Sequence, residues 1–345
     1  MWGTEVCCSW QELPELLEAT SANTMPSRAL HRDLSTMAPD WERLRQATKE
    51  DILKTYEIIH RIRPNLWLCF VKKDHPAARS AIQALGADTS QVFNDLRKTF
   101  VVAKTLVEHS AASAIPLQQE HTVLTKLSSS PFPKLVKAYT QTSEGHQWIT
   151  ALLMRNIDRG VTLEQVRKHF STTSNEQLPI ELIAHTFVQT AHQLDTLYNE
   201  HQVAHMDIHA GNLVFDFTNI QPQTKLPGIS LIDFGASATA TVLQDRLPDA
   251  QKLCSMIAGL LQAGNGPEGK ERFDDFGLFE DAIIKGQKGE SGLKLLGPDK
   301  KFRQQAQECA NRCSKQIAEN LENLVERLAQ QELPDKVIEA AIESG

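Results

Sequence analysis

An aspartate and an asparagine stand five residues apart in a segment that holds both a candidate base and a candidate metal ligand. The segment reads His-Met-Asp-Ile-His-Ala-Gly-Asn at 205–212, and another aspartate, Asp233, follows the apolar run at 229–232. The spacing allows the carboxylate of Asp207 to face a hydroxyl acceptor while the amide oxygen of Asn212 turns back to a cation. Asp233, at a predicted strand end and before Phe-Gly, would supply a second oxygen ligand for that cation. These are the residue types that phosphoryl transfer from ATP requires.

The elements on either side of these residues are predicted from their apolar patterns. Residues 181–200 place apolar side chains on one stripe, which predicts a buried helix just before the segment. Short apolar runs at 213–215 and 229–232 predict two strands. Asn212 would then precede one strand and Asp233 would end the other, so the two residues could reach the same site.

The chain before about residue 160 has the pattern of a sheet with one helix packed on it. Upstream of the buried helix we predict short strands within 82–104, a helix at 116–127, and strands at 135–139 and 148–154. This order of strands and helix corresponds to an antiparallel sheet. Residues 1–78 and the chain after about 160 are mostly helical in pattern, including a long amphipathic stretch at 302–328.

Together, residues 205–212 and the Asp-Phe-Gly at 233–235 resemble the catalytic loop and the metal-binding triplet of protein kinases. The form Asp-Ile-His-Ala-Gly-Asn is closer still to the loops of aminoglycoside and choline-type phosphotransferases. The resemblance covers about 80–265 in the order of elements. It implies an atypical member of the protein-kinase-like superfamily, similar to bacterial effector protein kinases, that uses ATP with Mg²⁺ or Mn²⁺. Asp207 would be the catalytic base, and Asn212 and Asp233 the metal ligands.

The same resemblance implies the residues that bind the nucleotide. Lys104, at the end of Val-Val-Ala-Lys, resembles the strand lysine that holds the ATP phosphates. Glu120 on the following helix is the best match for its ion-pair partner, although Glu108 also precedes it. Met154 and Asn156 would belong to the hinge that receives adenine through backbone groups.

Four features depart from the family pattern or extend it. Residues 85–92 carry one glycine, Gly86, where the phosphate-binding loop of the family has three. Met206 stands where an arginine normally pairs with a phosphorylated activation loop, and the segment 236–248 is short and lacks an Ala-Pro-Glu ending. Asp249 resembles the aspartate that braces the catalytic loop from the start of a large helix, and an ordinary helix N-cap explains it equally well.

Composition and charge limit the partners of the chain. The 345 residues carry a net charge of −7, which argues against broad nucleic-acid binding. No run of about 18 apolar residues predicts a transmembrane helix, and the N-terminal residues do not resemble a secretory signal. Six cysteines without a Cys-x-x-Cys pair suit a reducing compartment. We therefore expect a cytoplasmic protein, or one in a host-cell cytosol if it is an exported bacterial effector.

The predicted fold class is α+β: a bilobal protein-kinase-like fold with a small antiparallel β N-lobe carrying one helix, a larger helical C-lobe, and a helical N-terminal extension. The predicted boundaries are 1–78 for the extension, 79–157 for the N-lobe, and 158–345 for the C-lobe with a helical extension from about 265. The two helical extensions could bind a regulatory partner or activator.

The predicted function is that of an ATP-dependent Ser/Thr protein kinase, and a protein is favoured over a small molecule as its acceptor. A small-molecule kinase of the aminoglycoside or choline type is the first alternative, suggested by the loop at 207–212 and the missing Ala-Pro-Glu. A pseudokinase that acts as a binding module is the second, suggested by the single glycine at Gly86. An enzyme of this fold that transfers AMP instead of phosphate is the third.

Overall fold

The computed structural model describes residues 40–72, 99–106, 111–127, 131–143, 145–157, 159–171, 178–262, 283, 300–333 and 337–338. The loop predicted at 85–92, with Gly86, lies outside these residues, as do Glu108 and the first 39 residues of the predicted extension. Within the described part of the chain, no helix has the length and apolar character needed to cross a membrane.

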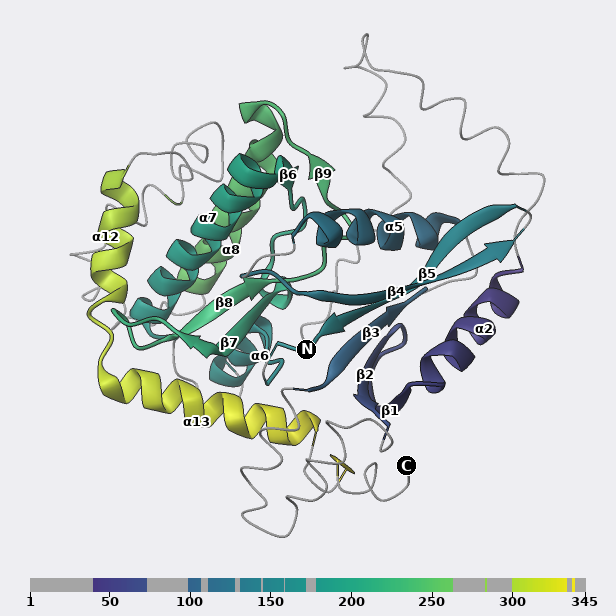
Figure 1. Cartoon of the computed structure of the whole chain (residues 1–345). Helices are drawn as coiled ribbons and strands as arrows, with labels where there is room; N and C mark the ends of the chain where they lie inside the picture. Colours follow the sequence, from purple (N-terminus) through teal and green to yellow (C-terminus); the bar gives the residue numbers. More distant parts are fainter. Residues whose placement is uncertain are drawn as a thin grey trace, which may run out of the picture. The chain divides into compact units, whose positions relative to one another are not determined.

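A five-stranded antiparallel sheet forms the first part of the described structure (Figure 1). The strands lie in the order β1-β2-β3-β5-β4. Their bounds are β1 Tyr56–Arg63, β2 Leu66–Val71, β3 Val101–Thr105, β4 Leu135–Ser143 and β5 His146–Arg155. The predicted α+β class and an antiparallel sheet are therefore confirmed, and β3, β4 and β5 lie where strands were predicted, whereas the part of the predicted strand region before residue 99 lies outside the described residues.

Two helices cover opposite faces of this sheet. Helix α5 (Ala111–Lys126) packs Leu117 and Leu124 in the same core as Leu152 of β5. Helix α2 (Trp41–Leu53) packs Ile52 in the same core as Leu153, the next residue of β5. Because successive residues of a strand point to opposite faces, α2 and α5 sit on the two sides of the sheet.

The predicted helical extension at 1–78 is wrong for part of its length. Residues 41–53 are helical, but Tyr56–Arg63 and Leu66–Val71 pair as the hairpin that begins the sheet. Trp67 and Cys69 of this hairpin are buried against β3. Pairing and burial in the sheet therefore favour a strand over a helix for this segment. The predicted boundary at 78/79 therefore cuts through one sheet, and the hairpin turns at Pro64-Asn65 without a glycine.

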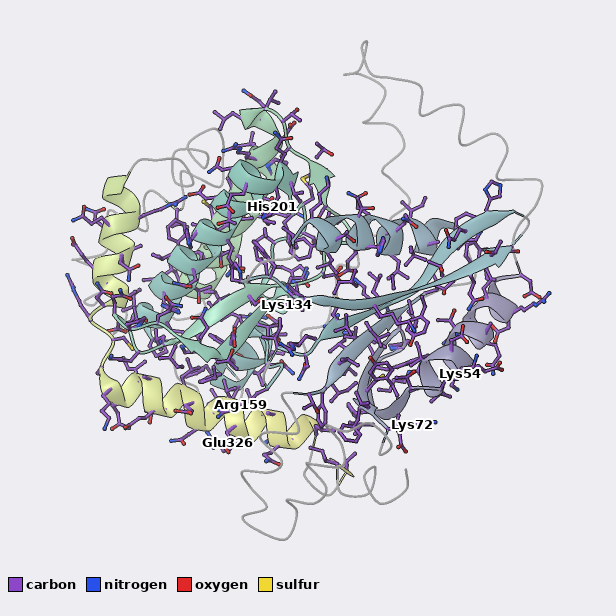
Figure 2. All side chains as sticks on the ribbon, in the orientation of Figure 1. Lys54, Lys72, Lys134, Arg159, His201 and Glu326 are labelled. Carbon is purple, nitrogen blue, oxygen red and sulfur yellow. The ribbon has the colours of Figure 1, made fainter. Side chains whose placement is uncertain are left out.

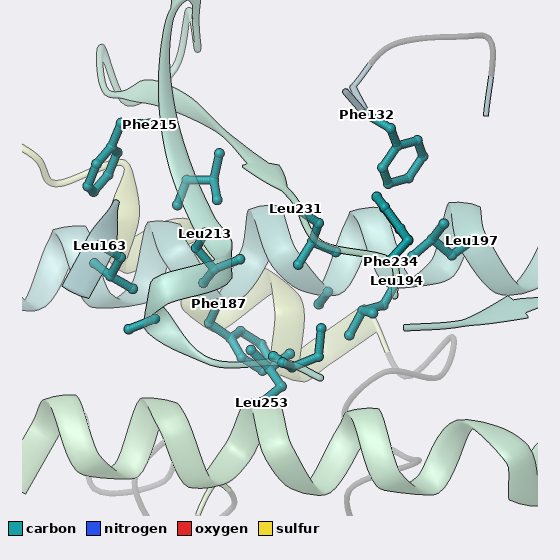
Figure 3. Close-up of a cluster of buried hydrophobic side chains, with 14 of the residues drawn as sticks. Phe132, Leu163, Phe187, Leu194, Leu197, Leu213, Phe215, Leu231, Phe234 and Leu253 are labelled. Atoms are coloured by element: carbon teal, nitrogen blue, oxygen red, sulfur yellow. The ribbon is translucent and has the colours of Figure 1, made fainter. Parts of the chain in front are cut away.

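The second part of the described structure is mainly helical. Helix α7 (Ile180–His201) packs between α8 (Leu247–Gln262) and a hairpin of β7 (Leu213–Ile220) and β8 (Pro227–Leu231). Figure 3 shows the apolar side chains that join these elements, including Phe187, Leu213 and Leu253. The helix predicted at 181–200 and the strands predicted at 213–215 and 229–232 are confirmed, with β8 ending one residue before 232.

The long helix predicted at 302–328 is two helices. Helix α12 (Lys300–Ala310) ends before a turn, and α13 (Lys315–Glu332) begins after it. Ser314 is the N-cap of α13, because its hydroxyl accepts a hydrogen bond from the Ile317 N–H at 3.2 Å. A serine cap satisfies one of the backbone donors at a helix start and so stabilises a new helix at this position.

A buried histidine makes the free energy of unfolding depend on pH. His185 of α7 is 1% exposed, and its Nε2 lies 2.8 Å from the Pro227 carbonyl oxygen. Burial lowers the pKa of His185 to about 4. Between pH 6.5 and 4 the unfolded chain therefore binds a proton at this residue that the folded chain does not. We expect the free energy of unfolding to fall by roughly 3 kcal/mol from this residue as the pH drops through that window.

Replacing His185 by glutamine should remove most of that pH dependence, because a glutamine amide can still donate to Pro227 but does not titrate. Urea unfolding at pH 7 and pH 4.5 measures it. The same substitution at His192, which is exposed on α7, serves as the matched control. Equal pH dependence in the wild-type chain and His185→Gln would contradict the assignment.

Candidate functional site

Three charged side chains from distant parts of the chain meet at one point. Lys104 on β3 places its Nζ 2.6 Å from Oε2 of Glu120 on α5 and 2.7 Å from Oδ1 of Asp233, which follows β8. The ion pair predicted between Lys104 and Glu120 is thus present. The Glu120 side chain is 1% exposed and that of Lys104 is 16% exposed, whereas that of Asp233 is 43% exposed. Of the three, Asp233 is the one that an incoming ligand can reach most easily.

The charges of this triad hold one another in place. Burial alone would raise the pKa of Asp233, but the positive charge of Lys104 and its hydrogen bond lower that pKa below the ordinary value. Burial raises the pKa of Glu120, and Lys104 opposes this only in part. Burial alone would lower the pKa of Lys104, and the two carboxylates instead raise it above the ordinary value. Lys104 therefore stays charged and Asp233 is a carboxylate over the physiological pH range.

The backbone after β8 turns sharply at Asp233. This residue has a φ of 65°, in the left-handed region that favours glycine. Gly235 allows the segment to pack closely against α5, because a Cβ there would lie 3.2 Å from Cβ of Pro116. Phe234 is fully buried, and its ring lies 4.9 Å from that of His205 between the centroids. The aromatic contact fixes the Asp-Phe-Gly segment against the loop at 205–212.

A buried carboxylate braces that loop. Asp249 of α8 is 0% exposed and accepts hydrogen bonds from the backbone N–H groups of His205 at 2.7 Å and Met206 at 2.6 Å. The hydroxyl of Tyr198 donates to it as well, at 2.9 Å. Met206 has a φ of 66°, so the bracing holds a strained residue next to Asp207. The bracing that the resemblance implied for Asp249 is present, although burial raises the pKa of its carboxyl despite these bonds.

Asp207 and Asn212 face each other across the loop. The Nδ2 of Asn212 donates to the carbonyl oxygen of Asp207 at 2.9 Å and lies 3.3 Å from its Oδ2. These bonds turn the amide nitrogen inward and leave the amide oxygen as the group that could meet a cation. His209 accepts a hydrogen bond from the Gly211 N–H at 3.1 Å, so its ring shapes the loop.

A lysine that the sequence reading missed lies beside Asp207. Lys252 of α8 donates to the Met206 carbonyl oxygen at 2.6 Å and lies 3.4 Å from Oδ1 of Asp207. Its signal was present in the sequence, because Lys252 follows Asp249 by three residues. Residues three apart on a helix share a face, and that face meets the loop.

Most of the predicted nucleotide-binding residues line one cavity of about 410 Å³, named here the first cavity. Ligand pockets in proteins are commonly about 300–1,000 Å³. The first cavity lies between the β1–β2 turn, β3, the residues after β5, and the β7–β8 hairpin. The predicted site residues that line it are Lys104, Glu120, Met154, Asn156, Asn212 and Asp233.

Asp207 lines a different cavity of about 490 Å³, named the second cavity. His209, Lys252 and Arg167 line it as well. Glu164 of α6 (Leu163–His169) lines both cavities, so the two are neighbours, and the pair Asp207–Asn212 spans them. The structure thus gathers the predicted site residues around two adjoining cavities, apart from Gly86, which is outside the described residues.

The oxygen donors of the first cavity suit a divalent cation only when a ligand or water supplies further oxygen atoms. Among the described residues, no three or more His, Cys, Asp or Glu side chains form a cluster that could hold a metal alone. Asn212 and Asp233 instead contribute one amide and one carboxylate to the first cavity. Mg²⁺ is commonly held by one or two carboxylates together with substrate phosphates and water. The residues present therefore fit such a cation when a phosphorylated ligand completes its coordination.

Comparison of the sequence with protein-family models and with curated protein sequences finds no match.

Proposed function

We propose that this chain is an ATP- and divalent-metal-dependent phosphotransferase of the protein-kinase-like superfamily, and that its acceptor is a serine or threonine hydroxyl of a protein. The observation that carries the proposal is the meeting of Lys104, Glu120 and Asp233 at one end of the first cavity. A buried lysine held between two carboxylates is a positive charge in a fixed position. Such a charge stabilises phosphate oxygens without reorganisation during the reaction.

The two parts of the described structure support a bilobal arrangement. The five-stranded sheet with α5 would be the smaller lobe, and the helices from α6 onward the larger lobe. Residues 154–157, where β5 ends at the first cavity, would be the hinge between them. The N–H of Asn156 donates to the Phe100 carbonyl oxygen at 3.0 Å, so the hinge is tied to the sheet on one side.

In the proposed reaction, ATP occupies the first cavity and the acceptor occupies the second. Asp207 takes the proton of the acceptor hydroxyl while the hydroxyl oxygen bonds to the γ-phosphorus. The bond from that phosphorus to the β–γ bridging oxygen breaks, and ADP leaves. A bound Mg²⁺ or Mn²⁺ would neutralise charge on the phosphates, and Asn212 and Asp233 would hold it. Lys252 lies within reach of Asp207 and would offset negative charge near the transferred group.

The phosphates would meet an arginine where the family has glycines. The turn between β1 and β2 contributes Arg63 and Asn65 to the lining of the first cavity. An arginine can donate two parallel hydrogen bonds to a phosphate. The absence of glycine in this turn therefore does not exclude phosphate binding, and it weakens the case for a pseudokinase.

The charge of the second cavity argues against a cationic acceptor. Its lining includes two carboxylates and two cations, and each carboxylate has a cation nearby: Glu164 with Arg167 at 2.7 Å, and Asp207 with Lys252 at 3.4 Å. A site for an aminoglycoside or choline would be expected to hold an excess of carboxylates. The small-molecule alternative is therefore disfavoured relative to a neutral hydroxyl on a protein.

The test is incubation of the full chain with labelled ATP, Mg²⁺ or Mn²⁺, and either a set of proteins or a set of aminoglycosides, choline and sugars. We expect label in the chain itself or in an added protein, on serine or threonine, with a mass increase of one phosphoryl group. A mass increase of AMP would replace the proposal by nucleotidyl transfer. Label only in a small molecule would support the small-molecule kinase. ATP binding without any transfer would support the pseudokinase.

A further inference from the structure

The C-terminal part of the described chain reaches back to the first cavity. Ala329, in the last turns of α13, and Leu333, just after its end, both line this cavity. They are 9% and 8% exposed. They lie between 96 and 121 residues after Asp233 and Asn212 in the sequence, so neither local pattern nor motif spacing connects them with the site.

Leu333 belongs to a small apolar cluster on the sheet. It packs with Ile338, which is 1% exposed, and with Leu68 of β2 and Phe100 just before β3. Val102 of β3 packs against the same cluster. Leu68, Phe100, Val102 and Leu333 all line the first cavity, so the C-terminal residues extend an apolar surface that the sheet begins.

This apolar surface lies at the hinge end of the first cavity. Val102 pairs with Met154 in the sheet, and the Phe100 carbonyl oxygen accepts from the Asn156 N–H at 3.0 Å. Lys104, one inward-facing position further along β3, marks the polar end instead, with Asp233 2.7 Å away. A ligand with a flat apolar ring at one end and phosphates at the other would match this polarity.

The middle of α13 is fastened close to the hinge. Arg159 lies just after the hinge residues, and its Nη2 is 3.5 Å from Oε1 of Glu322, while its Nη1 donates to the Glu322 carbonyl oxygen at 3.4 Å. Its guanidinium also lies 4.8 Å from the ring centroid of Phe217. Figure 2 shows Arg159 beside α13, near the labelled Glu326. The helix end is therefore placed by contacts that do not involve Leu333.

We propose that Ala329 and Leu333 form part of the adenine-binding wall of the first cavity, with Ile338 supporting Leu333 from behind. This rests on the proposed function. The cavity keeps about 410 Å³ with these residues in place, so they line the space and do not fill it. Burial of the base against Leu333 would add apolar contact that this chain obtains from its own C-terminal segment.

The test is isothermal titration calorimetry of the full chain with ATP and Mg²⁺, with adenosine, and with inorganic tripolyphosphate. Leu333→Ala is expected to weaken binding of ATP and adenosine by the same factor, about five- to twentyfold, and to leave tripolyphosphate binding unchanged. Ala329→Leu, which adds bulk to the wall, is expected to weaken ATP and adenosine as well.

Leu324→Ala is the matched control. Leu324 of α13 is 3% exposed but does not line the first cavity. Its truncation should therefore lower the melting temperature without changing the affinity for ATP or adenosine. Equal affinity for ATP in the wild-type chain and Leu333→Ala would contradict the assignment of Leu333 to the adenine-binding wall. The proposed function would not be affected by that result. Tighter binding in Leu333→Ala would also contradict that assignment, because the leucine would then occupy the space of the ligand. If the wild-type chain bound neither ATP nor adenosine, the proposed function would fail, and the wall with it.

Discussion

Replacement of Asp233 by asparagine is expected to lower phosphate transfer from ATP by about a thousandfold or more. The substitution keeps the shape of the side chain but removes the carboxylate charge that Lys104 faces at 2.7 Å. Asp233 is the one carboxylate among the two residues of the proposed metal site. Asp207→Asn should have an effect of similar size, because an amide cannot accept the proton of the acceptor hydroxyl. Transfer of labelled phosphate under saturating ATP measures both.

A matched control separates chemistry from folding. Asp216 of β7 lies in the same hairpin region, bonds to the Thr218 N–H at 3.0 Å, and lines neither cavity. Asp216→Asn should therefore transfer phosphate at the wild-type rate. Melting temperatures of all three variants show whether each is folded at the assay temperature. Wild-type turnover in folded Asp233→Asn would remove this residue from the reaction and the metal site with it.

The elements near the motifs could be predicted because their signals are local. The helix before the loop and the two strands around it carry their apolar patterns within a few residues of Asp207 and Asp233. The first hairpin was missed for the opposite reason. Leu44, Ile52, Tyr56 and Ile59 continue one helical stripe by spacing, yet α2 ends at Leu53. The apolar run of β2 after the Pro-Asn turn was the local sign of a hairpin, and its pairing with β3 decided the outcome.

The site divides in the same way. Asp207 and Asn212 are five residues apart, and Asp249 bonds to the loop that contains them, so spacing and resemblance were enough to predict that these residues meet. Arg63 and Leu333 reach the first cavity from elements far away in the sequence. No periodic pattern predicts that they meet there, because the meeting depends on how the sheet and α13 pack on one another. The cavity lining beyond the motifs had to come from the fold.

Replacement of Lys104 by methionine is expected to lower the free energy of unfolding by about 3–5 kcal/mol at pH 8. Methionine has nearly the same length, so the change removes the charge more than the packing. Glu120, 1% exposed, would then be a buried carboxylate without its cation, with Asp233 adding a second negative charge nearby. Double-mutant analysis by urea unfolding measures the effect. Lys104→Met/Glu120→Gln should recover most of the lost stability, although phosphate transfer should stay low in both variants because the phosphates lose their cation.

The pH dependence of the Lys104→Met variant gives an independent reading of the same pair. Without Lys104, burial raises the pKa of Glu120 further above its value in the unfolded chain. A carboxyl whose folded pKa is raised stabilises the fold when it is protonated, so the contribution is present at low pH and is lost as the pH rises through the folded pKa. The stability deficit of Lys104→Met should therefore shrink between pH 8 and pH 5. It should stay nearly constant in Lys104→Met/Glu120→Gln, where that carboxyl is absent. A deficit in the single variant that does not change with pH would show that lost packing, and not the unpaired charge of Glu120, destabilises it.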